Sequence, residues 1–164
     1  MKKVSLLLLT LCAGAFAQSD TVVHWRGIQG VITAPAVDNP VGQIHSGAGP
    51  WTTQAGSVRI NLNTGEGTFD VDGLVLNGGT SSGTPGGVKS VVGTLVCNPG
   101  NSGGGTETAI DTPATPLSSD GNAELSFKLT VPVVCNNPLF LIRVPAGKWI
   151  ATATKPATSP TPGY

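Results

Sequence analysis

Apolar and polar residues alternate along several segments of the chain, at the period of two that is typical of a β-strand with one buried face. The most regular segment is 123–131, where the apolar positions fall on one face and the polar positions, Glu124 among them, on the other. The same alternation flanks a turn segment at Asn63–Gly67, with Arg59 on the polar side of the first run. Glycines in that turn can adopt positive φ, so the pattern predicts a β-hairpin.

Further strands are predicted on both sides of this hairpin. Val88–Cys97 is rich in Val and Thr and is typical of a central strand. Residues 139–144 and 149–153 flank four turn residues and predict a second hairpin. Residues 21–32 indicate one long strand with a glycine bulge, and 33–56 indicate a long surface excursion.

About seven or eight short strands without an amphipathic helix predict an all-β fold, an antiparallel β-sandwich. The 23 glycines and 13 prolines among 164 residues disfavour long helices. The length suits a single domain with one core.

The N-terminus has the three parts of a secretory signal peptide. Lys2 and Lys3 precede an apolar run, and Ala15-Phe16-Ala17 is a cleavage pattern. A lipoprotein signal acylated at Cys12 is the alternative, although Leu11 stands where such signals have a small residue. We therefore expect a signal peptide at 1–17, a sandwich domain at 18–154 and a flexible proline-rich tail at 155–164. The protein is expected to be secreted, extracellular or periplasmic, with no transmembrane segment.

Two cysteines remain after the predicted signal, Cys97 and Cys135. In an oxidising compartment they are expected to form a disulfide, because no basic residue lies close in sequence to activate either as a free thiol. Both cysteines stand at predicted strand ends. The bridge should therefore join two turns at one end of the sandwich.

The charge balance argues against a nucleic-acid partner. Nine basic residues stand against nine acidic ones, and removal of Lys2 and Lys3 would leave an excess of acid. General nucleic-acid binders carry the opposite excess. A cell-surface component or a glycan is the alternative kind of partner.

Three carboxylates, Glu66, Asp70 and Asp72, lie within seven residues. Asp70 and Asp72 would share one strand face roughly 7 Å apart, a spacing that can bind calcium or support acid–base chemistry. Acidic residues on a solvent-facing strand are the alternative interpretation, and we expect no cofactor beyond a weak calcium site.

Histidine and tryptophan supply the other candidates. His24 and His45 are separated by a long loop and lack the spacing of a zinc motif. Trp51 follows a Gly-Ala-Gly-Pro loop, where an exposed ring could stack on a sugar or dock a partner. Trp51 and His45 are thus the candidate ligand-binding residues, and packing roles are the alternative for each.

Four segments carry a resemblance to a known group: Val58–Leu76, Gly93–Cys97, Cys135–Arg143 and Gly147–Ala151. Together they resemble an uncharacterised family of short secreted bacterial β-sandwich proteins. The segment Gln43–Gly49 is similar to part of the chordin-type repeat domain, with Gln43 in place of that segment's first His. Both resemblances imply an extracellular β-fold, and neither supplies a catalytic residue.

Three functions remain as hypotheses. The first is a secreted, non-catalytic binding protein or envelope-associated structural protein. The second is a carbohydrate-binding module that uses Trp51. The third is a secreted metal-binding protein or enzyme that uses the histidines and the acidic cluster.

Overall fold

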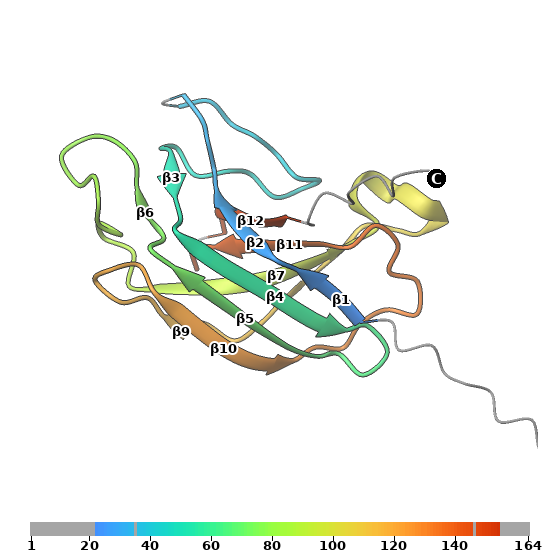
Figure 1. The fold of residues 1–164 in the computed structure, drawn as a ribbon. Coiled ribbons are helices and arrows are strands. Elements are labelled where there is room, and N and C mark those ends of the chain that lie inside the picture. The colour runs from blue at the N-terminus through green and yellow to red at the C-terminus, as the bar shows by residue number, and fades with distance from the viewer. Residues whose placement is uncertain (1–21, 35, 146, 155–164) are drawn as a thin grey trace, which may run out of the picture.

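The computed structural model describes residues 22–34, 36–145 and 147–154, and this part of the chain is almost entirely β-structure (Figure 1). The all-β, antiparallel prediction is confirmed. The described strands number twelve, more than expected, because several are only two residues long. The predicted signal peptide at 1–17 and the tail at 155–164 lie outside the described residues.

The strands form two main sheets. The four-stranded sheet has the order β1-β4-β5-β10, with bounds Val22–Trp25, Ala55–Asn61, Glu66–Asp72 and Ala123–Lys128. The six-stranded sheet has the order β2-β12-β11-β7-β8, with bounds Gly27–Gly30, Trp149–Thr154, Leu139–Arg143, Ser90–Cys97 and Thr108–Asp111. Its sixth strand, β9 (Thr115–Pro116), pairs with β7.

Two small elements complete the fold. Strands β3 (Trp51–Thr52) and β6 (Val75–Leu76) pair with each other apart from the main sheets. The 3-10 helix η1 (Pro99–Gly104) follows β7. Both predicted hairpins are confirmed, as β4–β5 and as β11–β12.

The two main sheets share one aromatic core. Phe140 of the six-stranded sheet lies 5.8 Å, ring centre to ring centre, from both Phe69 and Phe127 and 6.3 Å from Trp25, all three in the four-stranded sheet. In Figure 1 the four-stranded sheet passes in front of β7 and β11. Gly93 on β7 leaves the space for the Phe140 ring, since a Cβ at that position would lie 2.5 Å from its Cζ. Aromatic packing therefore joins the sheets.

The prediction of one long strand over residues 21–32 is wrong. The segment forms two strands in different sheets, because β1 pairs with β4 while β2 pairs with β12. Trp25 and Ile28 are both buried although they are three residues apart. A continuous strand cannot place such residues on one face, so the chain changes sheets at Arg26.

The surface excursion predicted for residues 33–56 is wrong in part. Ile44, Ser46 and Trp51 within it are at most 7% exposed. The backbone of Gly47 donates to the carbonyl of Trp149, and that of Trp149 donates to the carbonyl of His45. The segment thus packs beside the start of β12 and contributes to the core.

The predicted disulfide between Cys97 and Cys135 is confirmed. Next to it, the buried side chain of Asn98 donates to the carbonyls of Thr106 and Val134 and accepts from the backbone of Asn136. Asn98 has a φ of 53°, a conformation that asparagine tolerates better than most residues. The disulfide and Asn98 together fix the loops at this end of the sheets.

We expect replacement of both cysteines by alanine to lower the free energy of unfolding by about 4 kcal/mol, because the bridge closes a loop with a sequence separation of 38 residues. Urea unfolding of the oxidised protein and the variant would measure this difference. Addition of a reductant should reproduce the loss in the wild type and leave the variant unchanged, and an equal midpoint for all samples would contradict the prediction.

We expect Phe140→Ala to lower the free energy of unfolding by roughly 3–5 kcal/mol, because it removes the ring around which three aromatic side chains pack. Val133→Ala is the matched control, since Val133 is fully exposed. Chemical denaturation followed by tryptophan fluorescence provides the measurement. Equal losses for the two variants would show that the aromatic core does not hold the sheets together.

Candidate functional site

The outward-facing residues of the four-stranded sheet form the candidate site. Side chains along each strand alternate between the core and solvent, so the strand register places the outward residues in rows. One row runs across the sheet from His24 to Arg59, Thr68 and Ser126, and the next from Ser57 to Asp70 and Glu124. We call this surface the charged face. It consists of His24, Arg26, Ser57, Arg59, Glu66, Thr68, Asp70, Asp72, Glu124, Ser126 and Lys128.

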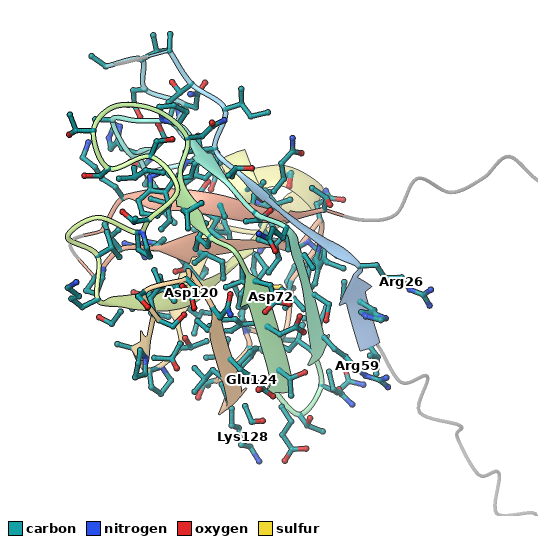
Figure 2. All side chains as sticks on the ribbon, turned by 60° about the vertical axis from the view of Figure 1, so that its left-hand side comes forward. Arg26, Arg59, Asp72, Asp120, Glu124 and Lys128 are labelled. Carbon is teal, nitrogen blue, oxygen red and sulfur yellow. A yellow bond between two sulfur atoms is a disulfide. The ribbon has the colours of Figure 1, made fainter. Side chains whose placement is uncertain are left out.

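The β1 side of the charged face is basic. His24 and Arg59 are direct cross-strand neighbours, and Arg26 follows the end of β1 (Figure 2). All three residues are exposed. Their side chains make no hydrogen bond or ion pair with any residue that the structure describes. The basic side chains of this side are therefore available to contact a ligand.

The opposite side is mainly acidic, and its one lysine, Lys128, pairs with Glu66. Asp70 lies directly across from Glu124, and Asp72 is one outward position further along β5. Directly opposed like charges destabilise a sheet. The Ser57 hydroxyl donates to one Asp70 oxygen at 2.6 Å, whereas Asp72 and Glu124 make no side-chain contact of this kind within the described ranges. Figure 2 shows Asp72, Asp120 and Glu124 on this side, away from Arg26 and Arg59.

Two shallow depressions lie on the charged face. One, of about 520 Å³, is lined by Arg59, Asn61, Glu66, Thr68 and Ser126. The other, of about 280 Å³, is lined by Asp70, Asp72, Asn122 and Glu124. Between Glu66 and Lys128 there is an ion pair of 3.3 Å with both side chains exposed, which contributes little to stability. The first depression is also lined by Val22 and Phe127, so the face offers open contacts that are polar and in part apolar.

The structure does not bring the three predicted calcium ligands together. Asp70 and Asp72 share a depression, but Glu66 is at the far end of β5 and pairs with Lys128. Among the described residues no group of three or more potential ligands is placed to hold a metal ion. Glu124 is the carboxylate that accompanies Asp70 instead.

The two histidines lie in different places. His24 belongs to β1, whereas His45 lies before β3, where its Nδ1 is 2.5 Å from Asp38 Oδ2. Ser46 is next to His45 in sequence, but its hydroxyl contacts Asp38 and the backbone of Asn39. These contacts stabilise the loop between Asp38 and Ser46. They do not pair a serine nucleophile with a histidine base.

Asp38 has a pKa below its ordinary value. The hydrogen bond with His45 is the main cause, and the backbone N–H of Ser46 adds to it. Both contacts favour the ionised carboxylate. The stabilisation that they provide is present above the ordinary pKa of aspartate and is lost as the pH falls through the lowered value.

The exposure predicted for Trp51 is wrong. Its side chain is 5% exposed and lies in β3, which pairs with β6. The Gly-Ala-Gly-Pro run before it does form a loop, but backbone bonding to Val31 draws Trp51 into the core. An indole that is 5% exposed leaves little ring surface for stacking on a sugar.

Sequence patterns predicted that Arg59 and Glu124 point outward. They did not predict that these residues belong to one charged surface. Alternation shows which way a strand residue points, whereas the grouping of charges depends on which strands are neighbours. That β1 adjoins β4 and β10 adjoins β5 becomes visible only in the folded sheet.

Comparison with protein-family models, curated proteins and solved structures found no match. Among the described residues, no helix has the length and apolar character needed to span a bilayer. The function has therefore to be argued from the site itself.

We expect Asp38→Asn to reduce thermal stability near neutral pH and to have progressively less effect as the pH falls below the ordinary aspartate pKa of 3.8. The physical reason is that the wild type loses its charged partner for His45 over this range. Melting curves of both proteins between neutral and acidic pH test the prediction. A difference in midpoint that stays constant with pH would contradict it.

Proposed function

We propose that this protein is a secreted, non-catalytic binding protein or an envelope-associated structural protein, and that the charged face is its binding surface. The observation that carries the proposal is the set of exposed charges on this face that lack partners within the described chain, Arg26, Arg59 and Glu124 among them.

The other sheet provides a comparison within the same molecule. On the six-stranded sheet, Arg143 donates to Asp111 at 2.8 Å and to the Thr94 hydroxyl at 3.3 Å. Its side chain is only 17% exposed. The protein thus pairs arginine with aspartate on one sheet and leaves arginines unpaired on the other, which supports a binding role for the charged face.

The disulfide supports the proposed location. Disulfides persist in oxidising compartments and are rare in the cytosol. Stable loops beside Cys97 and Cys135 also suit a protein that works outside the cell. The glycan-binding hypothesis that depended on an exposed Trp51 has no support from its position.

The test is a sedimentation binding assay with insoluble probes, namely purified peptidoglycan sacculi, cellulose and chitin. Wild-type protein is compared with Arg59→Ser/Glu124→Gln, which removes one charge of each sign from the face. Lys89→Ser is the control, because Lys89 is exposed and lies outside this face.

We expect the wild type and the control to be retained by at least one probe and the double variant to bind it about tenfold more weakly, as for loss of contacts central to an interface. The concentration of protein that remains in the supernatant, measured over a range of probe amounts, gives the dissociation constant. Lack of retention on all three probes, or equal retention of all three proteins, would contradict the proposed function.

A further inference from the structure

Apart from the ion pair between Glu66 and Lys128, the charges of the charged face are divided between its two sides. Arg26, Arg59 and His24 lie on or next to β1 and β4, whereas Asp70, Asp72 and Glu124 lie on β5 and β10. Figure 2 shows the labelled arginines and the labelled carboxylates Asp72, Asp120 and Glu124 at separate positions across this sheet. A ligand with charge of a single sign would be attracted by one side and repelled by the other.

We propose that the charged face binds a second copy of this chain. The proposal rests on the charged face being the binding surface, and it identifies the partner. It commits to an isologous, face-to-face dimer, in which the same surface of both copies is buried.

The position of the symmetry axis follows from the strand order. A two-fold axis parallel to the strands and lying between the two faces would place β1 of one copy over β10 of the other. The basic side of each copy would then face the acidic side of its partner, twice in the dimer. An axis perpendicular to the strands would instead bring β1 onto β1 and oppose like charges, so the first arrangement is favoured.

The chemistry of the face supports this partner. The three described tryptophans and the aromatic core residues Phe69, Phe127 and Phe140 are at most 8% exposed, and of these rings only Phe127 borders a depression on the face. Recognition would then depend mainly on charge and hydrogen bonding. A second copy complements both sides of the face at once, including the opposed Asp70 and Glu124.

The small size of the face argues for a weak dimer. Four strands spaced about 4.8 Å apart, with outward residues over four rows, cover a plane of roughly 400 Å² on each copy. Two such faces would bury about 800 Å² in total, which is below the roughly 1,200 Å² at which standard specific interfaces begin, so we expect a weak dimer in rapid exchange. Charge pairs at such an open interface are screened by salt, with a Debye length of about 10 Å at 0.1 M.

Sedimentation velocity of the full chain after signal removal tests the proposal, over a range of protein concentrations at about 0.01 and 0.5 M salt, where the Debye length falls from about 30 Å to a few ångströms. Two variants reverse the charge of one side each: Arg26→Glu/Arg59→Glu and Asp72→Arg/Glu124→Arg. Circular dichroism and melting curves of both variants verify the fold. Lys89→Glu is the control for a charge reversal outside the face.

We expect the wild type and the control to dimerise at low salt and to dissociate at high salt. Each variant alone should remain monomeric, because its two copies would present faces with the same sign of net charge to each other. An equimolar mixture of the two variants should form a heterodimer more readily than the wild type forms a homodimer, since a face with a net negative charge then packs against a face with a net positive charge.

A wild type that stays monomeric at low salt and high concentration would overturn the proposal, and so would a dimer that both variants still form. Failure here is distinguishable from failure of the proposed function. A monomer that still binds sacculi through Arg59 and Glu124 keeps the function and excludes the dimer, whereas a charge-dependent dimer without retention on any probe keeps the dimer and excludes binding of those probes.

Discussion

Packing around Phe140 is the interaction on which the rest of the structure depends. This ring from β11 contacts Trp25, Phe69 and Phe127, which come from three different strands of the opposite sheet. Aromatic residues bury large apolar areas and favour tilted or offset contacts such as these. Once they are buried, the direction of every other side chain in β1, β5 and β10 is determined by the alternation along the strand. The outward rows of charges are therefore a consequence of the core.

The two sheets differ in how many partners their outward-facing charged side chains have. Arg143 on β11 forms a compact network with Asp111, Thr94 and the carbonyl of Gly147. Outward groups of the four-stranded sheet have fewer partners, and carboxylates of Asp70 and Glu124 are directly opposed. Exposed like charges reduce stability slightly, by tenths of a kcal/mol up to about 1 kcal/mol for direct neighbours. Retention of such an arrangement fits a surface whose charges find partners in another molecule.

Local patterns in the sequence predicted the regular part of the fold. Alternation and turn glycines identified both hairpins, and the number of cysteines identified the disulfide between Cys97 and Cys135. Prediction from the sequence failed where tertiary contacts determine which sheet a strand joins and which side chains are buried. The sheet change at Arg26 follows from burial of both Trp25 and Ile28, and burial of Trp51 follows from a backbone bond to Val31 and pairing with β6. The candidate site depends on strand neighbours that are distant in sequence, so its residues could be identified as outward-facing but not as a group.

The central claim is that the four-stranded sheet presents the surface by which this protein recognises a second copy of itself. The most direct measurement is the set of backbone amide chemical shifts of isotopically labelled protein at low salt, recorded as the protein concentration is raised about tenfold through a weak dissociation constant. The account predicts concentration-dependent shifts confined to β1, β4, β5 and β10, and their reversal by salt. Shifts that are centred on the outer side of β7, β8 and β11, or spectra that do not change with concentration, would contradict it.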